Sequence, residues 1–228
     1  MSGLCAMEVC ADDALVEGCD EVLSDVCLTF AESLVRLAGG VIAGVKPAAI
    51  FGMPLKAYRA GRWRRLEREQ LDEVLRTYAA TLPAYGVSLS VLYRNKNRVF
   101  VLVWRPRHLN SVVSDPEHME ILRSAGYTGA SAPELVAELR RRLVDYYLSN
   151  PSEGHEFPHE IGVFLGYPAS DVRGFMAGLK PTCIGAWHAY GDESVAQQRF
   201  LELREHEHRC RRRYAAGEPL SSLFAVGA

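Results

Sequence analysis

The sequence contains no hydrophobic run long enough to cross a membrane. Its longer apolar stretches, such as 99–104, fall far short of the roughly 20 residues that a membrane-spanning helix requires. Hydrophobic residues make up 48% of the 228 residues and charged residues 24%, which excludes a disordered chain, a collagen-like chain and a small disulfide-rich scaffold. We therefore expect a globular protein that buries a sizeable core and has no membrane partner.

Basic residues are absent from the first 35 positions, which carry eight acidic residues. Secretory and organelle-targeting peptides begin with a basic segment, so the sequence predicts a cytoplasmic protein. The six cysteines form no CxxC pair, and the cytoplasm keeps thiols reduced. We interpret these cysteines as free thiols.

The common catalytic fingerprints are also missing. There is no GxGxxG dinucleotide loop, no GxxxxGK[ST] phosphate loop and no GxSxG nucleophile elbow. His159 and Glu160 begin a pattern like the zinc motif HExxH, but Val163 occupies the position of the second histidine, which is needed one helical turn further on to share a metal ion. The sequence thus disfavours dinucleotide enzymes, P-loop ATPases and HExxH zinc proteases.

Charge is unevenly distributed along the chain. Residues 36–142 carry a net charge of +9, whereas the whole chain carries −2. The densest basic part surrounds Trp63 and contains five arginines: Arg59, Arg62, Arg64, Arg65 and Arg68. Arginines beside an aromatic ring can bind phosphates and stack on a base. The alternative that we favour is a solvated segment that leads into a helix and pairs with nearby acidic residues, so nucleic acid is disfavoured as a partner.

Helical periodicity recurs along most of the chain. Apolar residues at three- and four-residue spacing predict a first helix from about 22 to 37, ending at Gly39-Gly40, and a second from 71 to 82. The segment 41–54 contains two glycines and two prolines, which favours a loop or a short helix carrying Lys46. Further helices are predicted in the second half of the chain, at 108–113, 116–124, 133–146, 161–165, 171–176 and 196–214.

Two strand-like runs follow one another at 87–93 and 98–105, and turn-forming residues separate them. They predict an antiparallel hairpin, and residues 183–190 are expected to form a third strand in the same sheet. Three strands among six or more helices favour the α+β class, with a small antiparallel sheet covered by several helices. We expect one domain over 16–228, preceded by a flexible acidic tail over 1–15.

The most distinctive stretch is FPHEIGVFLGYP at 157–168, followed by DVRGF at 171–175. With these motifs the chain resembles the bacterial domain-of-unknown-function family 3793 over roughly residues 35–225. Five later residues add to the likeness: Gly185, Trp187, Tyr190, Ala196 and Phe200. The resemblance implies no established activity, substrate or cofactor. Relatives encoded beside iron-transport and flavodoxin genes in anaerobic bacteria imply a link to iron or haem, which no residue of this chain demonstrates.

We expect the distinctive stretch to form the wall of a pocket. Pro158 precedes His159 and Glu160, which predicts that both lie in the first turn of a short helix. In a structural interpretation, Glu160 complements the helix dipole and His159 caps the helix or lines a cleft. In a functional one, His159 is a general base or metal ligand, Glu160 orients it, and another side chain donates a hydrogen bond. The candidate pocket residues are His159, Glu160, Tyr167, Lys46 and Asp171.

Two other site hypotheses involve cysteines. Cys183 could act as a nucleophile with His159 as its base and Asp171 as the orienting group, although nothing in the spacing brings the three together. His206 and Cys210 face the same way on one helix and could ligate a metal ion, but Cys210 also belongs to an apolar stripe. We favour a structural role in both cases and expect no metal site.

The favoured function is that of a cytosolic binding protein without enzymatic activity, whose partner is an unidentified small molecule or protein. Glycine, proline and aromatic residues dominate the distinctive segment and build shape more readily than reactivity, and Gly162 and Gly166 would let a partner group approach closely. We interpret three aromatic residues on strands as core rather than as a ligand cage: Trp104, Trp187 and Tyr190. The alternative is an enzyme, or an iron- or haem-handling protein, that uses His159 and Glu160.

Overall fold

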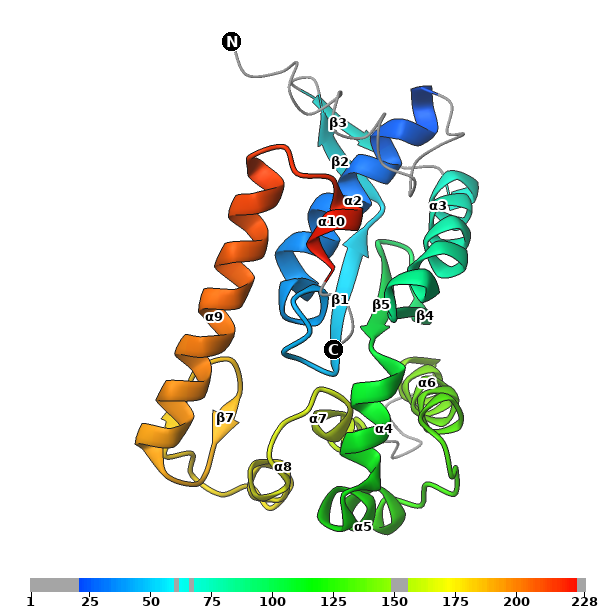
Figure 1. Ribbon diagram of the computed structural model, residues 1–228. Coiled ribbons are helices and arrows are strands. Elements are labelled where there is room, and N and C mark those ends of the chain that lie inside the picture. Colours follow the sequence, from blue (N-terminus) through cyan, green and yellow to red (C-terminus); the bar gives the residue numbers. More distant parts are fainter. Residues whose placement is uncertain (1–20, 60–61, 66–67, 149–155, 225–228) are drawn as a thin grey trace.

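The computed structural model in Figure 1 describes residues 21–59, 62–65, 68–148 and 156–224. The tail expected over 1–15 lies outside the described residues. The helices are α2 (Glu21–Ile42), α3 (Arg68–Thr81), the 3-10 helix η1 (Leu82–Tyr85), α4 (Pro106–Ser114), α5 (Pro116–Ser124), α6 (Ala132–Leu148), α7 (Ile161–Phe164), α8 (Ala169–Met176), α9 (Glu193–Ala215) and α10 (Leu220–Leu223). The strands are β1 (Ala48–Pro54), β2 (Lys56–Arg59), β3 (Arg62–Arg65), β4 (Ser88–Arg94), β5 (Arg98–Trp104), β6 (Cys183–Ile184) and β7 (His188–Ala189). The fold is α+β, as predicted.

The main sheet has the strand order β1-β5-β4, and both pairings are antiparallel. The predicted hairpin is confirmed, because β4 pairs with β5 along its length, with one register shift after Val91. Asn95 closes the turn between them. Its side-chain oxygen accepts hydrogen bonds from the backbone N–H groups of Asn97 and Arg98, each at 2.9 Å.

The third strand of this sheet is β1, so the expectation of a third strand at 183–190 was wrong. β1 pairs with β5 from Ala48 to Pro54. A proline is tolerated there because β1 is an edge strand, and Gly52 leaves room for Phe100, whose ring would lie 2.9 Å from an added Cβ atom. Residues 183–190 instead contain β6 and β7, which pair with each other in a separate sheet.

The arginine-rich segment around Trp63 also differs from the expectation. It forms the hairpin of β2 and β3, in which Tyr58 lies opposite Trp63, and α3 begins only at Arg68. Aromatic residues favour strands, and each of these two strands contains one. The hairpin lies directly before α3 in the sequence.

Helix α2 extends to Ile42, but Ala38, directly before Gly39-Gly40, has non-helical φ and ψ angles of −122° and 19°, so the regular helix is interrupted close to its predicted end. The two glycines allow α2 to cross α9 at short range. A Cβ atom on Gly39 would lie 3.3 Å from the Cα atom of Glu207, and one on Gly40 would lie 2.8 Å from Leu203. Figure 1 shows α9 running along one side of the molecule beside α2. The missing side chains therefore bring the two helices together.

The sheet separates two hydrophobic clusters. On one face, Phe30 of α2 contacts the rings of Tyr78 and Phe51, at centroid distances of 4.6 and 6.2 Å. The other face packs against α4, α6 and α7 and includes Trp104 and Phe164. Alternate residues of β5 enter the two clusters, as expected for a strand that is covered on both faces. Among the described residues, no helix has both the length and the apolar character to span a membrane.

A buried arginine closes the C-terminal end of α2. Arg105 follows β5, and two nitrogens of its guanidinium group donate to the backbone oxygens of Val41 and Ile42 at 2.7 and 3.0 Å. The cation satisfies helix carbonyl groups and complements the negative end of the helix dipole. Its backbone N–H also donates to the oxygen of Pro47 at 2.8 Å, which fixes the loop that carries Lys46.

Replacing Arg105 by methionine should lower the free energy of unfolding by about 2 to 4 kcal/mol, because the carbonyl groups of Val41 and Ile42 each lose a charged donor. The exposed neighbour Arg107 provides the control, and R107M should change this free energy by less than about 0.5 kcal/mol. Urea denaturation of both variants measures the difference. Equal stability of the two variants would contradict the capping role of Arg105.

Candidate functional site

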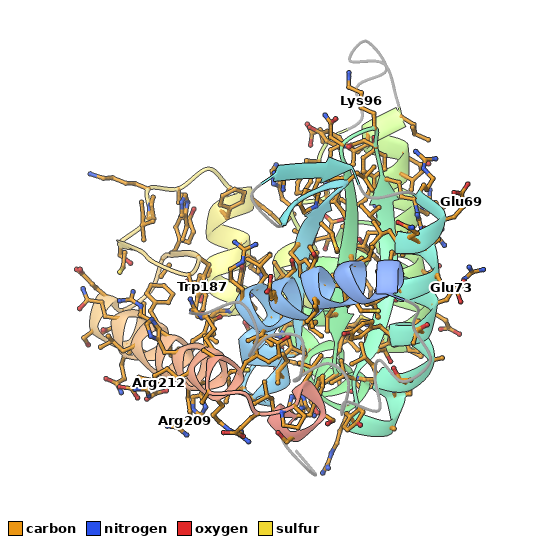
Figure 2. The ribbon with its side chains drawn as sticks, turned by 90° about the horizontal axis from the view of Figure 1, so that it is seen from above. Glu69, Glu73, Lys96, Trp187, Arg209 and Arg212 are labelled. Atoms are coloured by element: carbon orange, nitrogen blue, oxygen red, sulfur yellow. The ribbon has the colours of Figure 1, made fainter. Side chains whose placement is uncertain are left out.

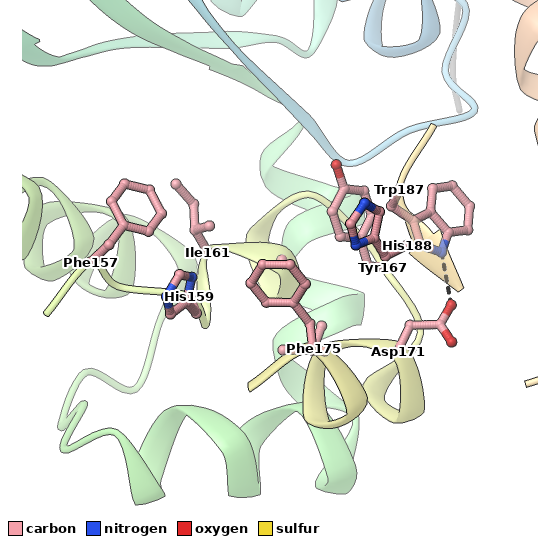
Figure 3. A pocket seen from close by; sticks show the side chains of 10 residues that line it. Phe157, His159, Ile161, Tyr167, Asp171, Phe175, Trp187 and His188 are labelled. Carbon is pink, nitrogen blue, oxygen red and sulfur yellow. Dashed lines mark hydrogen bonds between the residues drawn. The ribbon is translucent and has the colours of Figure 1, made fainter. Parts of the chain in front are cut away.

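A pocket of about 270 Å³ lies between the segment that leads into α7, helix α8 and the β6–β7 hairpin. We call it the aromatic pocket (Figure 3). Its lining residues are Phe157, His159, Ile161, Gly162, Tyr167, Asp171, Val172, Phe175, Trp187 and His188. One stretch of the chain, 157–188, therefore builds the whole pocket. This stretch contains the motifs that the sequence analysis singled out.

Aromatic rings form a row along the pocket. The imidazole of His159 meets Phe175 edge-on at a centroid distance of 5.1 Å and lies 5.4 Å from Phe157, while Phe175 lies 5.8 Å from His188. Figure 3 shows Phe175 between the two histidines. His159, Phe175 and His188 are all exposed. The row of rings is therefore accessible from solvent.

Trp187 closes one end of the aromatic pocket. Its indole stacks on the ring of Tyr167 at a centroid distance of 5.0 Å and an angle of 23°, and it meets Phe200 of α9 edge-on at 4.5 Å. Figure 2 shows Trp187 next to α9. Trp104 is core, as expected, whereas Trp187 is half-buried: it packs against the small cluster of Ala189, Ala196 and Phe200 and also lines the pocket.

Asp171 anchors the segment that carries Trp187. Its carboxylate is 6% exposed; one oxygen accepts a hydrogen bond from Nε1 of Trp187 at 2.7 Å, and the other accepts one from the backbone N–H of Tyr190 at 2.8 Å. Gly174, one helical turn after Asp171, makes room for the ring of Tyr190, which would lie 2.5 Å from an added Cβ atom. Helix α8 thus holds the β6–β7 hairpin through a buried, charge-assisted pair of hydrogen bonds.

Gly162 and Gly166 make room for the protein's own residues rather than for a partner group. A Cβ atom on Gly162 would lie 3.0 Å from Val172. Gly166 has a φ angle of 75°, which favours glycine, and a Cβ atom there would lie 2.5 Å from Pro47. The second contact joins the turn after α7 to the loop after α2.

Glu160 lies outside the aromatic pocket. Helix α7 begins at Ile161, and no side chain caps it, so the expected place of His159 and Glu160 in its first turn was wrong. Glu160 is buried, and its carboxylate lies beside the hydroxyl group of Tyr127. Burial, and then the charge of Glu160, raises the pKa of Tyr127 well above its usual value. His159 and Glu160 do border a common polar cleft of about 590 Å³, separate from the aromatic pocket.

Lys46 lines a neighbouring cavity of about 280 Å³ rather than the aromatic pocket. Its Nζ atom lies 5.7 Å from the ring centroid of Tyr167, and Trp187 borders both cavities. Burial lowers the pKa of Lys46, and the charge of Glu207 opposes this with a smaller effect. The aromatic pocket therefore brings together three of the five candidate residues: His159, Tyr167 and Asp171.

The two cysteine hypotheses gain no support from the geometry. Both oxygens of Asp171 are engaged by the hairpin, so this carboxylate does not orient His159 toward Cys183. Cys210 is buried in the core, and burial raises the pKa of its thiol to about 11. Within the described ranges, no three His, Cys, Asp or Glu side chains form a group that could hold a metal ion.

The sequence analysis missed Phe175 and His188 as pocket residues. Phe175 stands three and four residues after Val172 and Asp171, a spacing that places all three on one face of α8. This periodicity could have identified Phe175 as a lining residue. The position of His188 depends on the β6–β7 hairpin. The sequence analysis predicted one continuous strand over 183–190 and therefore did not place His188 beside the pocket.

Residues 34–224 match the family described as protein of unknown function (DUF3793). The chain belongs to this family. No curated protein and no solved structure matches the chain. The matched range includes the aromatic pocket and the neighbouring cavity, so both belong to the part of the chain that defines the family.

Replacing Asp171 by alanine should lower the free energy of unfolding by about 2 to 4 kcal/mol, because the buried donors of Trp187 and Tyr190 lose their acceptor. Asparagine should cost less, since its carbonyl oxygen still accepts one of the two hydrogen bonds. The exposed neighbour Ser170 provides the control variant S170A. Chemical denaturation measures the three stabilities, and a D171A protein as stable as S170A would contradict the anchoring role.

Cys210 should react with a disulfide reagent at pH 8 much more slowly than Cys183, because the thiolate is the reactive form. Its folded pKa of about 11 exceeds the ordinary value of 9.0. The buried neutral thiol therefore stabilises the fold fully below about pH 9, and this stabilisation is lost as the pH rises toward about 11. Mass spectrometry of labelled peptides measures the rates. Comparable labelling of the two cysteines would show that Cys210 is not buried as described.

Proposed function

We propose that the protein binds a small, flat and largely apolar ligand in the aromatic pocket, without catalysing a reaction on it. The observation that carries the proposal is the accessible row of rings formed by His159, Phe175 and His188, which adjoins the stacked rings of Tyr167 and Trp187. Aromatic walls offer apolar faces and edges on which another ring packs favourably. The proposal therefore specifies an aromatic ligand class.

The size of the pocket supports a ligand of one or two rings. Its volume of about 270 Å³ lies near the lower end of ligand pockets, which begin at about 300 Å³. This space corresponds to roughly nine water molecules in the liquid. The imidazoles of His159 and His188 have no hydrogen bond within the described part of the chain, so they are available to a polar substituent on the ligand.

The carboxylates near the pocket support binding rather than catalysis. Asp171 is engaged by Trp187 and Tyr190, and Glu160 lies beside Tyr127. Among the described lining residues, no carboxylate is therefore left to orient His159, as a general base usually requires. The alternative, an enzyme or an iron- or haem-handling protein built on His159 and Glu160, has less support for the same reason. We include a cytoplasmic location in the proposal.

Isothermal titration with indole, a flat two-ring probe, tests the proposal. The wild-type protein should bind it with a Kd of about 0.1 to 1 mM, as expected for a ligand of this size. Phe175 is 44% exposed, so F175A should leave the fold stable and weaken indole binding about threefold to tenfold through loss of one ring contact. H159A should behave in the same way.

Leu179 provides the matched control, because it is an exposed apolar residue close in sequence that does not line the pocket. L179A should bind indole as the wild type does. A second control is cyclohexanol, whose puckered ring should bind more weakly than indole. The proposal would be wrong if the wild type gave no saturable heat at millimolar indole, or if F175A and L179A bound indole equally well.

A further inference from the structure

The cavity that contains Lys46 differs in chemistry from the aromatic pocket. We call it the lysine cavity; it has a volume of about 280 Å³ and lies between the loop after α2, the turn after α7 and helix α9. Six of its lining residues matter here: Lys46, Trp187, Arg199, Glu202, Leu203 and His206. Three of these six carry basic groups. The indole of Trp187 separates this cavity from the aromatic pocket, because it borders both.

The position of Lys46 is fixed by the backbone around it. Gly44 has a φ angle of 74°, and the N–H groups of Val45 and Lys46 donate to the oxygen of Gly40 at 2.9 and 3.1 Å. This is a glycine-dependent helix end, which directs the chain sharply away from α2. Lys46 therefore reaches the cavity from a short, hydrogen-bonded loop, which limits the entropy that it loses when it binds a ligand.

The amine of Lys46 has no counter-ion within hydrogen-bonding distance. Among the described residues, no hydrogen bond or ion pair reaches its Nζ atom, which lies 5.7 Å from the ring centroid of Tyr167. The charge of Glu207 acts on it from further away, and that carboxylate pairs with Arg211 at 3.6 Å. Lys46 is half-buried, and a partly desolvated cation without a partner gains from the arrival of an anion.

Two further basic groups join Lys46 from α9. Arg199 and His206 are separated by seven residues, which places them on one face of the helix, and neither has a hydrogen bond or ion pair within the described ranges. All three basic groups of the cavity are therefore available to a ligand.

The lining contains one carboxylate, that of Glu202, against the cationic groups of Lys46 and Arg199, so positive charge is in excess. Glu202 lines the cavity, and its Oε1 accepts a hydrogen bond from Gln198 at 2.8 Å. Burial lowers the pKa of Lys46 more than the charge of Glu207 raises it. The nearby negative charge therefore does not fully offset the cost of removing the ammonium group from water. A bound anion would reverse this balance and favour the protonated amine.

We propose that the lysine cavity binds the carboxylate or phosphate group of a small anion, through Lys46, Arg199 and His206. Lys46 supplies a compact charge at the bottom of the site, and Arg199 supplies a planar fork that matches two oxygens of such a group. Trp187 and Leu203 provide the apolar part of the wall. This site is additional to the aromatic pocket and does not depend on its function.

Titration with inorganic phosphate and with succinate, followed by amide chemical shifts at constant ionic strength, tests the proposal. Neither probe contains a ring, so the aromatic pocket cannot account for its binding. Both should shift the amides of Val45 and Lys46 and those of 199–206, and the anion with the lower Kd is the preferred one. K46M and R199M should each weaken binding by about tenfold or more, because each removes a charged hydrogen-bond donor.

Two controls make the result specific. R204M removes an exposed arginine from a different face of α9, and K180M removes an exposed lysine outside the cavity; both should bind like the wild type. K46M should also be at least as stable as the wild type, because it replaces a half-buried amine, which has no hydrogen-bond partner among the described residues, by an apolar side chain of similar length. A loss of stability in K46M would assign Lys46 a structural role and overturn the proposal. Binding by succinamide equal to that of succinate, no response to either anion at millimolar concentration, or equal binding by K46M and K180M would also overturn it.

Discussion

The functional part of the structure depends on the two hydrogen bonds that the carboxylate of Asp171 accepts. Residues 183–190 contain only two strands of two residues each, and Ile184 is 68% exposed, so apolar burial within this hairpin is small. The two hydrogen bonds to Trp187 and Tyr190 connect it to α8. They are buried and involve a charge, which makes each one stronger than a neutral hydrogen bond in water. The place of Trp187, and with it the wall between two cavities, follows from this contact.

That shared wall separates two kinds of chemistry. On one side the rings of His159, Phe175 and His188 form an apolar pocket. On the other, Lys46 and Arg199 face a cavity whose cations lack counter-ions in the described part of the chain. One residue, Trp187, borders both cavities, so its position determines part of the shape of each.

Much of the fold could be predicted from the sequence, because local patterns determine it. The β4–β5 hairpin follows from two apolar runs around Asn95, and the long helices follow from their periodicity. The errors arose where long-range contacts decide the outcome. Gly39-Gly40 is typical of a helix end, and α2 is interrupted at Ala38, but helical residues follow to Ile42 because α9 packs against the two glycines. Pro54 argued against a strand, but β1 lies at the edge of the sheet, where a proline is tolerated.

The candidate site was only partly predictable for a related reason. Composition and motif spacing located the segment that contains His159, Tyr167 and Asp171, but not the direction of each side chain. Glu160 directly follows His159, yet its carboxylate lies beside Tyr127, from another part of the chain. Asp171 was considered as the orienting group of a catalytic set, whereas its oxygens accept hydrogen bonds from a hairpin that had been predicted as a single strand. Such pairings depend on tertiary packing, which one sequence does not reveal.

The most direct test of the account is the NMR signal of the Trp187 indole N–H in isotope-labelled protein, assigned with W187F. The account predicts that this proton exchanges slowly with water, because it is hydrogen-bonded to the buried carboxylate of Asp171. It also predicts a progressive shift of the signal when indole is added, because Trp187 lines the aromatic pocket. Rapid exchange with water, or a signal that indole leaves unchanged while other residues respond, would contradict the assignment of Trp187 as the anchored wall of the binding site.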